Sequence, residues 1–236
     1  MKPFVMILLL IAFVAPRAFA DLDSGVAAYE KKEYEKARKE FAAAAKAKNP
    51  VGMHLLAALY HEGHGVKKDM KRAVELYEKA AEKGYAPSQG NLGVIYHTGD
   101  GVKKNIEKAL KYYVEAGKRG DMQSTFNLGQ IFRTGDGVKK DLPRALAYYR
   151  LAAQQGYLPA MNEYGLIYAR GDGVKKDLVE AYAWVSFATE EDDVQAKKNL
   201  EELKKLLGDD LEEAKRRAAV IEKEIGRIRK AGGIAR

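Results

Sequence analysis

The four histidines of the chain are the residues whose type and spacing come closest to a metal site. His61-Glu62-Gly63-His64 resembles a zinc-binding helix, and His54 lies seven residues before His61. A zincin site needs His-Glu-x-x-His, because that spacing puts both rings on one helical face. Here the two histidines are three positions apart and a helix-ending glycine lies between them. We therefore expect histidines of loops and grooves, His97 included, and no bound metal.

Serine-based hydrolysis also lacks its required spacing. A serine nucleophile of the β-lactamase and penicillin-binding type needs Ser-x-x-Lys. The residues three positions after the four serines are Ala27, Asn91, Asn127 and Thr189, and none is a lysine. The chain contains no Gly-x-Ser-x-Gly elbow, no phosphate-binding glycine loop, no dinucleotide fingerprint and no cysteine. These absences predict a non-enzymatic protein without a cofactor.

Composition and charge indicate a globular protein with a basic excess. Of the 236 residues, 47% are hydrophobic and 31% are charged, which is typical of a chain with a packed interior. Lys and Arg number 41 and Asp and Glu number 33, for a net charge of +8. An excess of this size favours acidic partners without identifying one.

The N-terminal segment has the pattern of a secretory signal peptide. Lys2 supplies a positive charge, Phe4 to Ala15 form an uncharged apolar run, and Ala18-Phe19-Ala20 suits a signal peptidase. The run is too short to span a bilayer as a helix. We expect residues 1–20 to be removed between Ala20 and Asp21, leaving a periplasmic or secreted protein with no stable membrane insertion. A retained anchor is the alternative.

A repeat with a period of 36 residues organises most of the chain. The motif Gly-Val-Lys-Lys-Asp/Asn begins at Gly65, Gly101, Gly137 and Gly173, without insertion or deletion between copies. Other positions keep the same phase and form the columns Ala57/Gly93/Gly129/Gly165, Tyr60/Tyr96/Phe132/Tyr168 and Tyr77/Tyr113/Tyr149/Val185. These columns set the repeats at 50–85, 86–121, 122–157 and 158–193.

Each repeat predicts two helices joined by a glycine loop. The first helix should stop at a glycine pair such as Gly99 and Gly101, where a positive φ costs little. The expected N-caps of the second helices are Asp69, Asn105, Asp141 and Asp177. The expected C-caps are Gly84, Gly120 and Gly156. One such unit cannot bury its apolar face alone, so the units must stack into a superhelix.

The glycine loop, the alanine columns and the 36-residue step resemble Sel1-like repeats, which are relatives of the tetratricopeptide repeat. The resemblance implies an all-α, right-handed superhelical solenoid of helix-turn-helix repeats. It also implies a non-enzymatic scaffold for protein–protein interaction, although some Sel1-like proteins have been described as β-lactamases. A cell-envelope hydrolase is therefore one alternative, but the expected groove contains almost no carboxylate beyond Glu62.

The segments on either side of the repeats are predicted to cover the two ends of the repeat array. Residues 21–49 resemble a shorter tetratricopeptide-type unit, with Tyr29, Tyr34, Ala37 and Phe41 in suitable places. Residues 194–236 predict two amphipathic helices and a short tail, the first helix ending at Gly208. The apolar stripe of the last helix is Leu211, Ala214, Ala218, Ile221, Ile225 and Ile228. The alternative for this helix is contact with a partner or with a second copy.

By resemblance to tetratricopeptide arrays, the solvent-facing side of each first helix lines a concave groove. The groove positions are His54, His61, Gly90, Val94, His97, Phe126, Gln130, Arg133, Asn162, Leu166 and Arg170. His61, His97 and Arg133 share one repeat column, which suits an acidic segment of a partner protein or a terminal carboxylate. Histidine would tighten such binding below about pH 6.5. A polar groove without a particular partner is the alternative.

Paired lysines in the four loops form the most regular charge pattern. They are Lys67, Lys68, Lys103, Lys104, Lys139, Lys140, Lys175 and Lys176. Stacked repeats would bring them into a basic ridge able to bind an anionic glycan or surface, while solvated, solubilising loops are the alternative. Nucleic acid is not expected, because the protein is exported and no aromatic residues are interleaved with the lysines.

Overall fold

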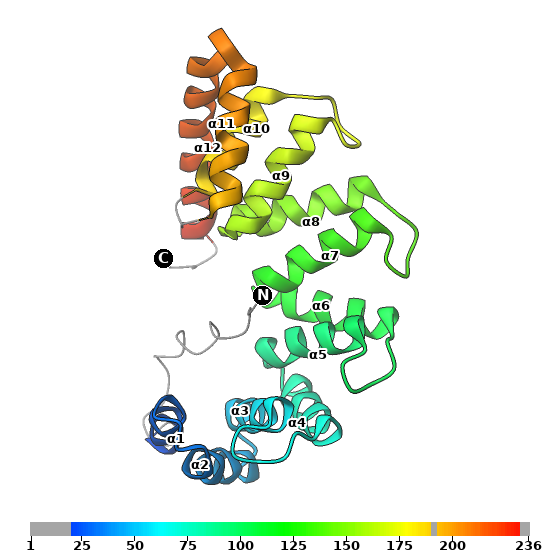
Figure 1. Ribbon diagram of the computed structural model, residues 1–236, viewed down its shortest axis with the longest axis vertical. Helices are drawn as coiled ribbons and strands as arrows, with labels where there is room; N and C mark the ends of the chain where they lie inside the picture. Colours follow the sequence, from blue (N-terminus) through cyan, green and yellow to red (C-terminus); the bar gives the residue numbers. More distant parts are fainter. Residues whose placement is uncertain (1–19, 190–192, 232–236) are drawn as a thin grey trace. The chain divides into compact units, whose positions relative to one another are not determined.

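The computed structural model describes residues 20–189 and 193–231 of the protein, and in this part of the chain it contains helices and no strands (Figure 1). The helices are α1 (Ala20–Glu30), α2 (Tyr34–Lys46), α3 (Pro50–Glu62), α4 (Met70–Glu82), α5 (Ala86–Thr98), α6 (Ile106–Lys118), α7 (Met122–Thr134), α8 (Leu142–Gln155), α9 (Leu158–Arg170), α10 (Leu178–Phe187), α11 (Val194–Leu207), the 3₁₀ turn η1 (Gly208–Asp210) and α12 (Leu211–Ala231). The predicted signal peptide lies outside the described residues except for Ala20. In the described ranges no helix is long and apolar enough to cross a bilayer.

The chain divides into two compact units, one ending at Ser88 and the other beginning at Gln89, within α5. In the first unit α2 packs against both α1 and α3, and α3 packs against α4. In the second unit α7 packs against α6 and α8, and α9 packs against α8 and α10. The pairing of successive helices confirms the all-α solenoid expected from the repeat pattern.

The loop inside each repeat is closed by the same bonds. The side chains of Asp69, Asn105, Asp141 and Asp177 accept the backbone N–H three residues on at 2.9–3.0 Å. Their own backbone N–H groups donate to the carbonyls of Tyr60, Tyr96, Phe132 and Tyr168. The four predicted N-caps are therefore confirmed. Gly156 caps α8, whereas Gly84 and Gly120 come one residue after the caps Lys83 and Arg119, with positive φ of 77° and 90°.

Successive loops of the second unit lie side by side because their glycines pack on the preceding repeat. Gly137 has a φ of 72°, and a Cβ on it would collide with Ile106, the first residue of α6. Gly173 has a φ of 77°, and a Cβ there would lie 3.0 Å from the Cβ of Leu142, the first residue of α8. Only glycine supplies both this conformation and this close approach. The loops before α6, α8 and α10 thus form one edge of the unit.

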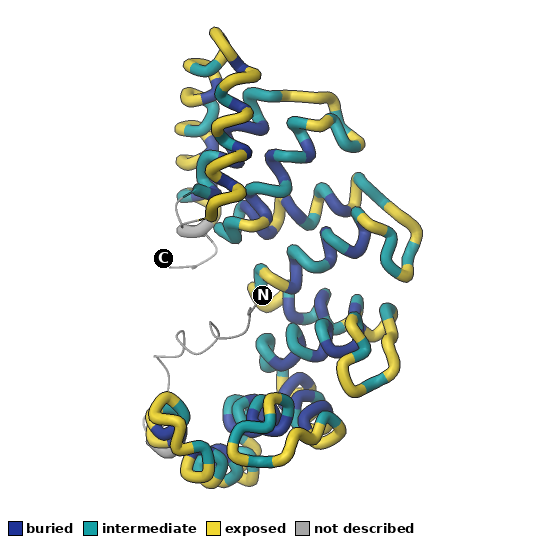
Figure 2. Tube along the Cα trace, viewed as in Figure 1, coloured by how far each residue is buried: buried dark blue, intermediate teal, exposed yellow. Residues whose placement is uncertain are grey.

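The interior is built from the small and aromatic columns of the repeat (Figure 2). The alanine column of the second helices is completely buried at Ala73, Ala109, Ala145 and Ala181. The rings of Tyr113 and Tyr149 are also buried, and Gly93 and Gly129 lie directly against them. Glycine in the first helix lets the tyrosine of the second helix approach its backbone.

The C-terminal helices pack on the last repeat. Both α11 and α12 contact α10, and α12 also contacts α8. The buried residues of these helices include Ala196, Leu203, Leu207, Ala214, Ile221 and Ile225. Ile228, which the sequence pattern placed in the same apolar stripe, is instead 40% exposed. The apolar stripe of α12 is therefore buried as far as Ile225 and becomes exposed at Ile228.

Two glycine-to-alanine changes should have opposite effects on stability, because Gly165 of α9 is packed closely against α10 and Gly226 of α12 is not closely packed. A Cβ on Gly165 would lie 2.7 Å from the carbonyl oxygen of Ala181, so Gly165→Ala should destabilise the protein by about 1–3 kcal/mol. Gly226 in α12 has open space around it, so Gly226→Ala should stabilise by about 0.5–1 kcal/mol through helix propensity. Urea unfolding followed by the fluorescence of Trp184 measures both. Equal stability of Gly165→Ala and the parent would contradict the packing argument.

Candidate functional site

The candidate site is the side of the first helices that the sequence assigned to a groove, called here the first-helix face. In the second unit its residues are Gly90, Val94, His97, Phe126, Gln130, Arg133, Asn162, Leu166 and Arg170. His54 and His61 on α3 are its counterparts in the first unit.

His54 lies in the interior of the first unit rather than on an open face. Its side chain is 6% exposed, its Nδ1 lies 2.9 Å from the hydroxyl of Ser88, and its ring packs between Tyr77 and Tyr85. Burial lowers the pKa of His54 to about 4, so the ring is neutral at pH 7. The expectation of an exposed groove histidine does not hold here, because two tyrosines from neighbouring elements close over the position.

The other histidines of the first unit contact aromatic rings. His61 is half-buried and lies edge-on to Tyr77, with ring centroids 6.3 Å apart. His64 stacks on Tyr34, and its Nδ1 is 3.0 Å from the hydroxyl of Tyr29 and 2.9 Å from the carboxylate of Glu62. In the described parts of the chain, no group of three His, Cys, Asp or Glu side chains is placed to hold a metal ion.

Phe126 occupies the same repeat column as His54 and has the same surroundings. Its ring centroid lies 5.5 Å from that of Tyr149 and 5.4 Å from that of Tyr157. Phe126 remains half-buried, so part of this residue stays accessible. At His54 and Phe126 the column is thus an aromatic packing position, whereas its other members are Gly90 and Asn162.

Arg133 is a cation held in place by uncharged groups. Its Nε donates to the hydroxyl of Tyr149 at 3.1 Å, and its guanidinium donates to the amide oxygen of Gln130 at 2.9 Å. The Tyr149 hydroxyl donates in turn to the same Gln130 oxygen at 3.1 Å. Burial raises the pKa of Tyr149 to about 12, so the hydroxyl stays protonated and able to donate. The result is a pre-oriented guanidinium that is half-buried.

His97 is engaged within the protein. Its Nε2 lies 2.9 Å from a carboxylate oxygen of Asp136 in the next loop, and its Nδ1 lies 3.5 Å from the hydroxyl of Tyr113. Lys104 donates to the same carboxylate at 2.8 Å. Hydrogen bonds from Lys104 and His97 hold the pKa of Asp136 below its ordinary value. His97 therefore links two repeats and has no free ring nitrogen for a partner.

The fourth repeat offers less open surface than the third. Asn162 accepts a hydrogen bond from Asn199 of α11 at 3.0 Å, so a helix of the chain itself contacts this position. Arg170 donates to Asp172 at 2.7 Å. Val94 and Leu166 are half-buried on α5 and α9. Of the two predicted groove arginines, Arg170 is paired with a carboxylate, whereas Arg133 is oriented by hydrogen bonds to uncharged groups.

All eight loop lysines are exposed. In the second unit the adjacent loops bring Lys103, Lys139 and Lys175, each with the lysine that follows it, to one edge. Lys104 is paired with Asp136, whereas Lys139, Lys140, Lys175 and Lys176 have no ion-pair partner among the described residues.

Sequence reasoning missed three features of this surface. Tyr149 is buried, yet its hydroxyl accepts a hydrogen bond from Arg133 on this surface. The pairing of Asp136 with His97 and the contact of α11 with Asn162 were not foreseen. The first had a signal, because the face column and the tyrosine column are separated by 16 residues in His61/Tyr77, His97/Tyr113 and Arg133/Tyr149.

Comparisons with known proteins agree with this architecture. The model of the Sel1 repeat family matches residues 50–85, 86–121, 123–157 and 158–193. A crystal structure of a Sel1 repeat protein from Oxalobacter formigenes is similar at 31% identity, covers 88% of each chain and has a TM-score of 0.75. A Sel1 repeat protein from Klebsiella pneumoniae shares the fold at 19% identity and a TM-score of 0.52, over 79% of this chain and 92% of its own. No curated protein sequence matches the chain.

Proposed function

The chain belongs to the Sel1 repeat family, and from this premise we propose that it is an exported, non-enzymatic scaffold that binds an acidic segment of another protein through the first-helix face. The signal-peptide pattern of residues 1–20 supports export. The absence of serine and cysteine nucleophile motifs from the sequence supports a binding role.

The observation that carries the proposal is the state of Arg133. A guanidinium held by Gln130 and Tyr149 loses little side-chain freedom when it binds a carboxylate. Its hydrogen-bond partners are neutral, and the carboxylates of Glu163 and Asp172 act on it only through charge, without a hydrogen bond. The guanidinium can therefore still form a charge-assisted bond to a partner. Phe126, which is half-buried, offers an apolar contact on the same helix. An acidic segment with an apolar neighbour matches these two groups.

The test compares two arginine variants of the mature protein as baits for periplasmic extract, read by mass spectrometry. Arg133→Ala should weaken retention of the partner by at least about tenfold, because a hydrogen bond to a charged group contributes about 1.5–3 kcal/mol. Arg150→Ala is the control, since this arginine is exposed on α8. A partner retained equally by both variants would refute the use of this face, provided that circular dichroism shows both to be folded.

Export has its own test. The mass of the intact protein recovered from the periplasm or the medium should correspond to residues 21–236. Recovery of the full-length chain from the cytoplasm alone would refute this part of the proposal, while leaving the binding face to be judged by the arginine variants.

A further inference from the structure

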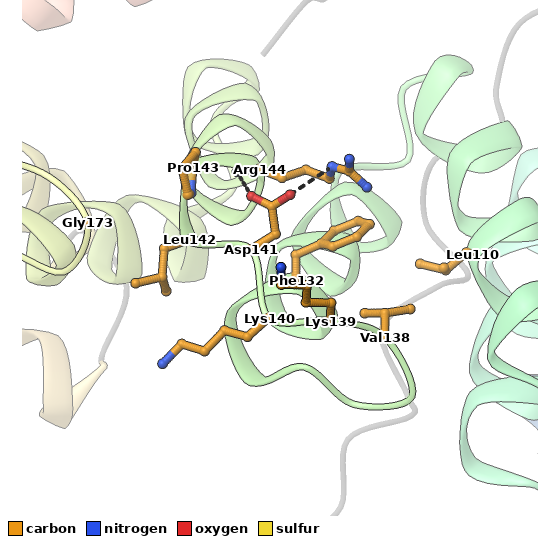
Figure 3. Close-up of a pocket in the computed structure, with 10 residues that line it drawn as sticks. All are labelled: Leu110, Phe132, Val138, Lys139, Lys140, Asp141, Leu142, Pro143, Arg144 and Gly173. Carbon is orange, nitrogen blue, oxygen red and sulfur yellow. Dashed lines mark hydrogen bonds and ion pairs between the residues drawn. The ribbon is translucent and has the colours of Figure 1, made fainter.

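The second unit has a depression of about 770 Å³ on its loop edge (Figure 3). Its lining does not include Gln130, Arg133 or Tyr149. Its apolar lining includes Leu110, Phe132, Val138 and Leu142. In Figure 3, Leu110 of α6 lies on one side of the loop before α8, and Leu142 and Gly173 lie on the other. The depression therefore joins parts of three successive repeats.

Three cations border this apolar surface. Lys139 and Lys140 are exposed, and neither has an ion-pair partner in the described part of the chain. The side chain of Arg144 is 57% exposed and lies over the ring of Phe132, with 4.6 Å from its Cζ to the ring centroid. Asp141 is the acidic residue of the lining; its Oδ1 caps the N-terminus of α8, and its Oδ2 lies 3.4 Å from the Nε of Arg144. One carboxylate thus stands against three cations, of which only Arg144 is paired with it. The rim is therefore positively charged.

The third repeat differs from its neighbours at this place. Phe132 stands where the other repeats have Tyr60, Tyr96 and Tyr168, and in the second repeat the hydroxyl of Tyr96 contacts Lys108. Pro143 stands where the first two repeats have Lys71 and Glu107. These substitutions remove a hydroxyl and a charge from the surface while keeping the cations around it.

The fourth repeat shows how such a surface is covered. The counterpart of Arg144 there is Glu180, and its carboxylate accepts hydrogen bonds from Arg217 of α12 at 2.6 Å and from the indole of Trp184 at 2.8 Å. A helix of the chain itself thus binds the outer side of α10 through opposite charges. In the third repeat the charge at this position is reversed, and no residue of α11 or α12 lines the depression within the described chain.

We propose that the depression on the third repeat is a second binding site, which takes an acidic peptide segment carrying one large apolar side chain. The apolar side chain lies on Phe132, Val138 and Leu142, and the flanking carboxylates bind Lys139, Lys140 and Arg144. The apolar lining distinguishes this site from the general basic edge, to which Lys175 and Lys176 also belong. The site is independent of Arg133.

The probe is a synthetic peptide of Asp and Glu residues with one central leucine, titrated into ¹⁵N-labelled protein. A second peptide has serine in place of the leucine. The leucine peptide should shift the amide resonances of Val138, Leu142 and Gly173 in a saturable manner, with a Kd at least about tenfold lower than that of the serine peptide. Absence of shifts at about millimolar peptide, or equal Kd values for the two peptides, would overturn the proposal.

Two matched charge reversals locate the site. Lys139→Glu with Lys140→Glu should weaken binding of the leucine peptide by at least about tenfold, whereas Lys175→Glu with Lys176→Glu should change it less than about threefold. Equal losses would indicate a general basic edge and overturn the proposal. Binding of phosphatidylglycerol vesicles without binding of the peptide would also overturn the proposal, because it would indicate an anionic surface as the ligand. Arg133→Ala must leave the peptide-induced shifts of Val138, Leu142 and Gly173 unchanged, which separates this test from that of the first-helix face.

Discussion

The free energy of unfolding of the N-terminal unit should fall by about 3 kcal/mol between about pH 6.5 and about pH 4, because His54 must give up its proton to fold. Burial lowers the pKa of His54 from 6.5 to about 4, so the unfolded chain binds this proton more tightly than the folded one. The contribution of His54 to stability is constant above pH 6.5. It is lost as the pH falls towards 4.

The measurement is urea unfolding by circular dichroism at several pH values, on the parent and on His54→Gln. An amide in this position cannot titrate and is able to keep a hydrogen bond to Ser88. Carboxylates also titrate in this range, but they contribute equally to both proteins, so the difference between the two pH profiles isolates His54. Coinciding profiles would mean that His54 is accessible to water, contrary to its burial.

Replacing Glu180 by alanine should cost about 2 kcal/mol and loosen α12, because two partners lose their acceptor together. The Glu180 side chain is 16% exposed and holds both Arg217 and the indole of Trp184. The pKa of Arg217 is raised by its hydrogen bond to Glu180, which is consistent with a pair that favours the charged form. Without the carboxylate, the charge of Arg217 and the indole N–H are left unmatched at the contact between α10 and α12.

Trp184 is the one tryptophan in the chain, so its fluorescence reports directly on this contact. We expect Glu180→Ala to shift the emission to longer wavelength and to lower the urea midpoint. Glu212→Ala is the matched control, because it breaks only a solvent-exposed ion pair between Glu212 and Lys215 within α12. This change should leave the emission wavelength and the urea midpoint unchanged. Indistinguishable emission and midpoints for the parent and Glu180→Ala would show that α12 docks by apolar packing alone.

The features that could be predicted from the amino-acid sequence are those that depend on local geometry or on the repeat period. Each helix cap at Asp69, Asn105, Asp141 and Asp177 bonds to a backbone group only three residues away, so spacing was enough to find it. The column Gly93, Gly129 and Gly165 follows from the fixed period, because every copy must meet the same neighbour in the stacked array. The all-helical solenoid and the limits of its repeats followed from these local and periodic constraints.

Whether a surface position is buried, paired or available depends on how the helices pack and could not be predicted from the sequence. His54 and Phe126 share one column, yet the first is buried and the second is only half-buried. His97 and Arg133 share another, yet a carboxylate of Asp136 hydrogen-bonds His97, while the hydrogen-bond partners of Arg133 are the uncharged Tyr149 and Gln130. These outcomes depend on partners 16 to 39 residues away, brought within hydrogen-bond reach by helix packing. A repeat period aligns equivalent positions, but the few ångströms that separate a buried, paired side chain from an available one arise only when neighbouring repeats are packed together.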